Sequence, residues 1–346
     1  MNVFDAHCDT ILRVIGEDAD FAEQHPLQVN LPAATIGGIG AQVFACWASS
    51  EQHPGQELHV ALNMAARVRS LVEEHADRLA HVTTSAEFAE CRRSGRIAVL
   101  IGLEGAVALD GVPEELDTFF DLGLRVLTIA WSDNSFCGSV FGSGSGLSEA
   151  GVALVKRCEE LGIVVDVSHA SDQAFADVLS CTRHPFIASH SNCRAVCPNP
   201  RNLSDDMIRQ LSDRGGVLGI NLGSGFLSED FFNRQNRHHQ RFFRQVNEEG
   251  IPFAEAMEEA RAAIASIPRP PVDWIARHVR HAIDVGGEDC VGFGSDFDGI
   301  ESTPVGIDSC ANYVEILETL ERNGLTTRQI EKVCWSNFER VICDIL

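Results

Sequence analysis

The sequence predicts an α/β fold of the (β/α)8 or TIM barrel class, and three observations support this prediction. Eight short apolar runs recur along the chain, and each is followed by a stretch with helical periodicity. The runs are continuously apolar, which is typical of parallel strands that are covered on both faces. The 346 residues, 45% of them hydrophobic, suit one large core, so we expect a single barrel domain over residues 1–346.

The eight predicted strands alternate with helices as a barrel requires. In chain order they are NVFDAHCD, IGAQVFACWA, IAVLIGLEG, LRVLTIAW, GIVVDVSHA, PFIASHS, GGVLGINLG and CVGFGSDFDG. Amphipathic stretches lie between them, at residues 57–78, 148–161, 171–180 and 204–214. The last three of these begin with serine, a favoured N-cap, which supports their assignment as helices.

The unit between the seventh and eighth strands is irregular. About sixty residues separate these strands, roughly twice what one connection between a strand and a helix needs. We expect extra helices here, which either cover the mouth of the active site or form a subunit contact. Residues 310–323 and 327–346 are predicted to form two closing helices at the C-terminal end.

Charge and composition restrict the class of protein. A formal charge of -23 argues against binding to nucleic acid, because phosphate contacts depend on lysine and arginine. The first strand begins within three residues of Met1, which leaves no room for a signal peptide, and no apolar run approaches the length of a membrane span. The twelve cysteines are scattered without a CxxC pair and suggest reduced thiols. We expect a cytoplasmic protein with no membrane segment.

Polar groups follow five of the predicted strands, at the barrel end where catalytic groups usually lie. They are His7, Asp9, Glu104, His169, His190, Asp296 and Asp298. Each alone has an ordinary explanation: a core histidine, a charge at a helix N-terminus for Glu104, or a turn residue for Asp296 and Asp298. Because a barrel rarely buries so many carboxylates and imidazoles without compensation, their joint presence favours a metal site.

Two metal ions use these side chains better than one. We expect His7 and Asp9 to bind one ion, His169 and His190 to bind the other, and Glu104 to bridge them. Ions roughly 3.5–4 Å apart can hold a hydroxide and polarise a carbonyl oxygen, as in two-metal hydrolysis. Imidazole and carboxylate ligands suit Zn²⁺ and also fit Mn²⁺, Co²⁺ or Fe²⁺.

The remaining candidate ligands are expected to have other roles. Cys8 alternates to the side of the strand opposite His7 and Asp9, so it should face the helical layer. His278 and His281 have helical spacing among polar neighbours, and His238 and His239 lie in a charged stretch; we expect both pairs on the solvated surface.

The chain resembles the renal (membrane) dipeptidase family of zinc-dependent barrels in the amidohydrolase superfamily. The resemblance covers nearly the whole chain and rests on DAHCDT, GLEG, DVSHAS, SHSNCRAVCPNPRNLSDD and VGFGSDFDG, which occur in the family's order and at compatible spacing. It implies that the metal ligands are His7, Asp9, Glu104, His169 and His190. It also implies that Asp296 is the catalytic aspartate and that Arg201 binds the terminal carboxylate of the substrate.

Two positions depart from the mammalian members of that family. Trp131 falls where those members have a histidine near the reaction centre, with Asn134 nearby, and Phe226 falls where they have a tyrosine. Both changes remove a polar group from the expected substrate pocket, so substrate preference cannot be transferred. Asp298 and Asn202 are expected to support the reacting groups or the substrate. The resemblance also implies a homodimer.

The resulting hypothesis is hydrolysis of small dipeptides by a hydroxide that bridges two zinc ions, with Asp296 as proton shuttle. Dipeptides of the type L-Xaa-D-Xaa or Xaa-Gly are the expected substrates. Two alternatives stay open: hydrolysis of another small amide, an N-acyl amino acid or a lactone, and a metal-binding regulatory protein without activity.

Overall fold

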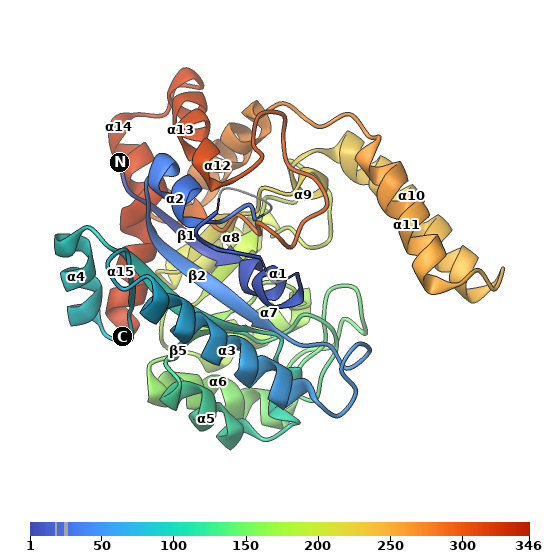
Figure 1. The fold of residues 1–346 in the computed structure, drawn as a ribbon, viewed down its shortest axis with the longest axis horizontal. Helices are drawn as coiled ribbons and strands as arrows, with labels where there is room; N and C mark the ends of the chain where they lie inside the picture. The colour runs from blue at the N-terminus through green and yellow to red at the C-terminus, as the bar shows by residue number, and fades with distance from the viewer. Residues whose placement is uncertain (18, 24–26) are drawn as a thin grey trace.

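The computed structural model describes residues 1–17, 19–23 and 27–346 and forms a closed parallel barrel surrounded by helices (Figure 1). The barrel strands are β1 (Val3–Cys8), β2 (Ile39–Trp47), β4 (Ile97–Glu104), β5 (Leu124–Thr128), β6 (Val164–Asp166), β7 (Ile187–Ser191), β8 (Val217–Ile220) and β9 (Val291–Phe293). Each pairs with its neighbour in parallel, and β1 closes the barrel by pairing with both β2 and β9. All eight predicted strands are present, and the TIM barrel prediction is confirmed.

One strand was not predicted. The short strand β3 (Leu79–His81) pairs with the first residues of β4, at the end of the barrel opposite the predicted metal ligands. It adds a ninth strand to the sheet without interrupting the pairing of β2 with β4.

Helices between the strands cover the outside of the barrel. In the first half they are α1 (Thr10–Gly16), α2 (Leu31–Gly37), α3 (Glu57–Glu74), α4 (Ser85–Ser94) and α5 (Leu116–Asp121). In the second half they are α6 (Glu149–Leu161), α7 (Asp172–Cys181) and α8 (Asp205–Asp213). The side chains of Ser148, Ser171 and Ser204 each accept a hydrogen bond from a backbone amide in the first turn of α6, α7 and α8, which confirms the three predicted N-caps.

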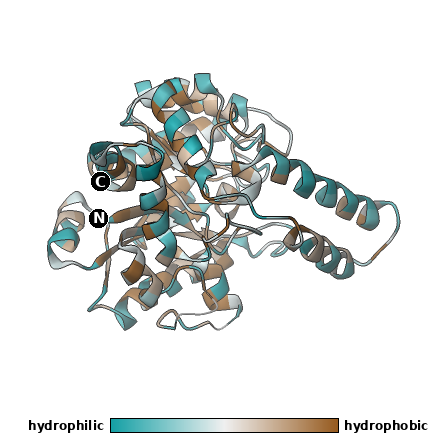
Figure 2. Cartoon of the chain, turned by 90° about the horizontal axis from the view of Figure 1, so that it is seen from above, coloured by the Kyte–Doolittle hydropathy of each residue, from teal (hydrophilic) through white to brown (hydrophobic). Residues whose placement is uncertain are grey.

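The predicted insertion between β8 and β9 forms four helices, α9 (Ser224–Leu227), α10 (Glu229–Asn247), α11 (Phe253–Ala265) and α12 (Asp273–Gly286). α10 and α11 pack against each other as a hairpin that projects from the barrel (Figure 1). In Figure 2 this hairpin is largely hydrophilic along α10. Its inner face has a small apolar cluster of its own around Phe242, Ala256 and Ala260.

Both predicted closing helices are present: α13 (Tyr313–Arg322) is the first, and the second is continuous from α14 (Thr327–Glu331) through a π-helical turn (Lys332–Ser336) to α15 (Asn337–Ile345). The main core is continuous across the barrel strands and the helices that cover them. All twelve cysteines are unpaired and ten of them are buried, in agreement with their prediction as core residues. Among the described residues, no helix is long and apolar enough to cross a bilayer.

Candidate metal centre

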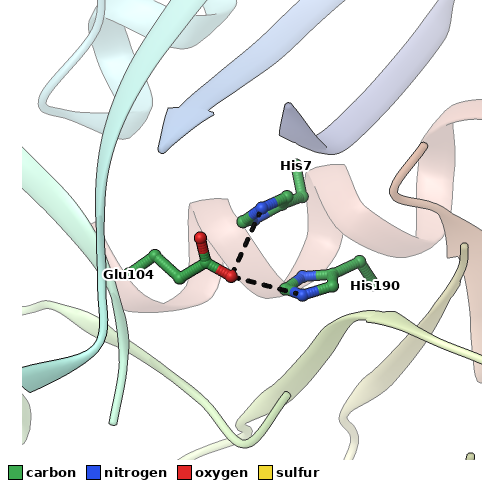
Figure 3. Close-up of side chains that lie close together, drawn as sticks. All are labelled: His7, Glu104 and His190. Atoms are coloured by element: carbon green, nitrogen blue, oxygen red, sulfur yellow. Dashed lines mark ion pairs between the residues drawn. The ribbon is translucent and has the colours of Figure 1, made fainter. Parts of the chain in front are cut away.

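Four histidine and glutamate side chains from different strand ends meet inside one end of the barrel. His7 lies in β1, Glu104 ends β4, His169 follows β6 and His190 lies in β7. Glu104 Oε1 lies 3.1 Å from His169 Nε2, 3.5 Å from His190 Nε2 and 3.7 Å from His7 Nε2. Figure 3 shows His7 and His190 directed toward this oxygen. One carboxylate oxygen therefore lies among three imidazoles.

The two aspartates of the predicted site lie beside His7. Asp9 Oδ2 is 3.5 Å from His7 Nε2. Donor atoms of His7, Asp9 and Asp296 all lie within 4.8 Å of one another, and so do those of His7, Glu104 and His190. On the other side of Glu104, the Nε2 atoms of His169 and His190 are 3.0 Å apart. The structure thus brings together all five predicted ligands and Asp296.

The charge balance of this cluster fits a bound cation. Burial lowers the pKa of His7, but the nearby carboxylates of Glu104, Asp9 and Asp296 outweigh it and raise that pKa to about 10. His7 Nε2 is nevertheless buried and has no hydrogen-bond partner among the described residues. Such an atom is costly unless another group satisfies it. A divalent cation would satisfy the imidazole and both neighbouring carboxylates together.

The other two imidazoles are suited to act as neutral ligands. Burial is the main cause that holds the pKa of His169 and of His190 well below the ordinary value, and the positive charges of Arg201 and His7 add to it. A neutral imidazole keeps a lone pair on one ring nitrogen, which is the form that binds a metal. Burial also raises the pKa of Glu104 well above its ordinary value, with the carboxylates of Asp9 and Asp296 adding to the effect.

The backbone is strained where two of these side chains leave their strands. His169 has φ of 67° and Asp296 has φ of 61°, values that residues other than glycine rarely adopt. Each such residue costs on the order of 1–3 kcal/mol and persists only where the surrounding structure demands it. The surrounding structure therefore fixes the direction in which these two side chains leave their strands.

A cavity of about 360 Å³ opens above the cluster. Asp9, Glu104, His169 and Asp296 line its floor, whereas apolar side chains including Trp47, Trp131 and Phe226 line its walls. The Trp131 ring contacts the Trp47 ring edge to face at 4.9 Å and lies 6.3 Å from the His169 ring. The structure therefore places Trp131 and Phe226 at the predicted pocket.

Arg201 lies next to the cluster but deeper than the cavity wall. Its guanidinium is 5.7 Å from the centre of the Phe226 ring, and it donates to Ser191 Oγ and to the carbonyl of His190. Burial lowers its pKa to about 10, although the charges of Asp296 and Glu104 oppose this shift, so it carries a positive charge at neutral pH. Its Nε is buried and has no hydrogen-bond partner among the described residues.

The family comparison agrees with this geometry. A model of the family described as membrane dipeptidase (peptidase family M19) matches residues 1–345. The chain belongs to the membrane dipeptidase family. The resemblance seen in the sequence motifs is therefore confirmed over the whole barrel.

Relatives and solved structures support the same family. Dipeptidase verJ of Clonostachys rogersoniana is 31% identical over 291 residues, 83% of this chain and 65% of that protein. A metallo peptidase from Rhodobacter sphaeroides, solved with a phosphinate mimic of the dipeptide L-Ala-D-Ala, has a TM-score of 0.85 and 27% identity, and the match covers 100% of this chain and 99% of that one. The dipeptidase AC of family M19 has a TM-score of 0.84 and 28% identity, with 99% and 98% covered.

Three residues predicted to contact the substrate, Arg201, Asn134 and Asp298, do not line the cavity of this dipeptidase family member. Asn134 uses its amide to bind the carbonyl of Ile129 and the backbone amides of Phe136 and Cys137, so it holds its own loop together. Asp298 accepts hydrogen bonds from Thr10 Oγ1 and Arg13 and from the backbone amide of Gln28. These partners give both side chains a structural role, whereas substrate contact by Arg201, Asn134 or Asp298 stays a prediction.

The predicted supporting role of Asn202 agrees with its contacts. Its amide donates to the carbonyls of Cys197 and Phe226, which links the loop that carries Arg201 to the wall of the cavity. Asn221, which was not among the predicted site residues, donates from its side-chain amide to Asp296 Oδ2 at 2.7 Å. Asn221 directly follows β8, so the rule that found the other strand-end groups would also have found it.

The surface prediction for His278 is wrong. This side chain is fully buried in α12; its Nδ1 accepts from the amide of Cys193, and its Nε2 donates to the carbonyl of Leu227. His239 is only partly exposed and, with Gln235, contacts Glu301 at the cavity rim. The beginning of α10 therefore contributes to the cavity mouth, whereas a subunit contact by the projecting hairpin stays a prediction.

Proposed function

We propose that this chain is a zinc-dependent dipeptidase that hydrolyses the peptide bond of small dipeptides. The observation that carries the proposal is the approach of three imidazole nitrogens to within 3.7 Å of one buried carboxylate oxygen, Glu104 Oε1, at the floor of a cavity. Membership in the membrane dipeptidase family supports the same activity.

In this proposal two cations share Glu104. His7 and Asp9 would bind one, and His169 and His190 would bind the other. Neutral imidazoles and carboxylates are a ligand set that suits Zn²⁺, with Mn²⁺, Co²⁺ or Fe²⁺ as possible substitutes. When bound, the two cations would polarise the scissile carbonyl and activate the attacking water as a bridging hydroxide.

Asp296 is the proposed proton carrier. Burial, together with the charge of Asp9, raises its pKa to about 7, so at neutral pH it can both accept and release a proton. Asn221 donates to Oδ2 and holds the carboxyl group at the edge of the cavity floor. Asp296 would take the proton of the attacking water as its oxygen bonds to the carbonyl carbon. It would then give that proton to the amine nitrogen as the carbon–nitrogen bond breaks.

Size and charge favour a dipeptide over a longer chain. The cavity of about 360 Å³ suits a small ligand, and Arg201, whose guanidinium lies 5.7 Å from the ring of the wall residue Phe226, would supply a positive charge for the terminal carboxylate. The Rhodobacter sphaeroides relative was solved with a mimic of L-Ala-D-Ala, which supports L-Xaa-D-Xaa dipeptides as first candidates, with Xaa-Gly beside them.

The experiment is a release assay with a stereochemically defined dipeptide library, with metal content measured on the same sample. We expect about two zinc ions per chain and turnover of a subset of dipeptides. N-acyl amino acids and lactones in the same assay test the alternative substrates. Glu104→Gln should lose both metal and activity, whereas Glu73→Gln, an exposed control on α3, should lose neither. A metal-free wild-type chain, or metal without dipeptide turnover, would contradict the proposal.

A further inference from the structure

A buried carboxylate outside the proposed ligand set ties three barrel strands together behind the metal centre. Asp166, at the end of β6, is fully buried. Its Oδ1 accepts from the backbone amides of Ser168 at 2.9 Å and Ser189 at 2.8 Å. Its Oδ2 accepts from Thr128 Oγ1 at 2.6 Å and from Ser189 Oγ at 2.5 Å. All four contacts use the carboxylate as acceptor.

This carboxylate reaches a proposed metal ligand through one hydroxyl group. Ser189 Oγ lies 2.7 Å from His190 Nδ1. A serine hydroxyl has a single proton, and here that proton is donated to Asp166. Ser189 must therefore accept from His190, which requires the imidazole proton to be on Nδ1. The second ring nitrogen, Nε2, is then left with its lone pair, 3.5 Å from Glu104 Oε1 and 3.0 Å from His169 Nε2.

We propose that Asp166 and Ser189 are positioning residues that select the metal-binding tautomer of His190. The inference rests on the proposed function, because it takes His190 as a ligand. Partners that hold the distant nitrogen of a ligating histidine fix both its tautomer and its ring orientation. In this chain the carboxylate acts across an intervening serine.

Two single substitutions separate this role from simple support of the core. Ser189→Ala and Thr128→Val each remove one hydrogen bond to the same oxygen, Asp166 Oδ2, but only Ser189 touches His190. The readout is zinc affinity, measured by competition between the metal-loaded full chain and a chromophoric chelator. Ser189→Ala should weaken zinc binding by about 10- to 100-fold, whereas Thr128→Val should change it much less. Ser189→Thr, which keeps the hydroxyl, should restore affinity.

Asp166→Asn tests the direction of the hydrogen bonds in the relay from Asp166 through Ser189 to His190. Two backbone amides donate to the Oδ1 position, so the asparagine oxygen must stay there and its NH2 group must face Ser189. Ser189 would then accept from that group and donate to His190 Nδ1, which moves the imidazole proton to Nε2. This reversal should weaken zinc binding at least as strongly as Ser189→Ala. In ¹⁵N-histidine spectra the His190 Nδ1–H signal should persist in Thr128→Val and be lost in Asp166→Asn.

The outcomes separate the two proposals. A wild-type chain that binds no zinc would refute the proposed function and the relay with it. A zinc-binding wild type with equal affinities in Ser189→Ala and Thr128→Val would refute the relay alone. If Asp166→Asn fails to fold, the comparison of Ser189→Ala with Thr128→Val still decides the question.

Discussion

Acidification should destabilise the folded chain through His278, which couples two loops beside the candidate site. Burial lowers the pKa of His278 from its ordinary value of 6.5 to about 4. At pH values between these two pKa values, the unfolded chain binds a proton at His278 and the folded chain does not. The free energy of unfolding therefore falls as pH is lowered through this window. The full difference corresponds to about 3 kcal/mol, of which about 2 kcal/mol falls between pH 7 and pH 4.5.

The physical cause of the lowered pKa is mainly the burial of His278; the nearby His281 adds to it, whereas the hydrogen bond to the carbonyl of Leu227 opposes it. The Nδ1 atom of His278 accepts from the backbone amide of Cys193 at 3.1 Å. Protonation of Nδ1 would break this bond, because two N–H groups would then face each other. Cys193 precedes the loop that carries Arg201, and Leu227, which accepts from Nε2, follows Phe226. Loss of these bonds would free the loop and the cavity wall together.

The assay is urea unfolding of wild type, His278→Gln and His281→Gln, followed by tryptophan fluorescence at about pH 7 and about pH 4.5. His281 is the matched control because it lies in the same helix, is partly exposed and contacts Asp205. His278→Gln should lose about 2 kcal/mol less than wild type on acidification, since it removes the titrating group, whereas His281→Gln should follow wild type. Equal pH dependence in His278→Gln and wild type would refute the reasoning.

Four further predictions concern the site. Asp296→Asn should lower kcat by about 10²–10⁴-fold with unchanged metal content; full turnover would exclude its proton role. Amidation of the substrate's carboxyl group should lower kcat/KM by at least about tenfold in wild type but little in Arg201→Ala; equal values in wild type would exclude the carboxylate contact. Trp131→Ala should raise KM by about tenfold for dipeptides with a large apolar side chain and leave Gly-Gly unchanged, as initial rates would report. Chelation should abolish activity and lower Tm, and zinc at about 100 times its Kd should restore about 3 kcal/mol of stability.

The sequence predicts the barrel well because its strands are read from continuous apolar runs. Every residue of β1 and β4 is buried, and both strands were found from their composition. The strand β3 was missed because only one of its three residues is buried, whereas β6 and β9 are equally short but fully buried. The pairing of β3 with β4 depends on a neighbour distant in sequence, and a window along the chain does not contain that information.

The sequence also predicts which side chains meet at the candidate site. Parallel strands bring their C-terminal ends to one face of a barrel, so side chains far apart in sequence, such as His7 and His190, are expected to meet. What the rule cannot determine is which strand-end group faces the cavity. Asn134 and Asp298 satisfy the rule, but Asn134 bonds to the backbone of its own loop and Asp298 bonds to α1 and the loop that follows α1. The opposite error occurs at His278. Its charged neighbours in the sequence led to a surface prediction, but its side chain lies on the buried face of α12.

Backbone conformation does not tell which strand-end carboxylate faces the cavity either. Asp296 and Asp298 both have positive φ, at 61° and 69°, yet one carboxylate lines the cavity and the other bonds to α1 and its neighbouring loop. Strain thus marks a position where the fold demands an unusual turn, and it does not distinguish a reacting group from a structural one. The distinction comes from the partners: Asp298 has donors on both oxygens, whereas Asp296 receives one donor from Asn221 and lies beside Asp9 and His7. A carboxylate with unfilled acceptor capacity, next to an imidazole without a partner, is the arrangement that a cation and a transferable proton require.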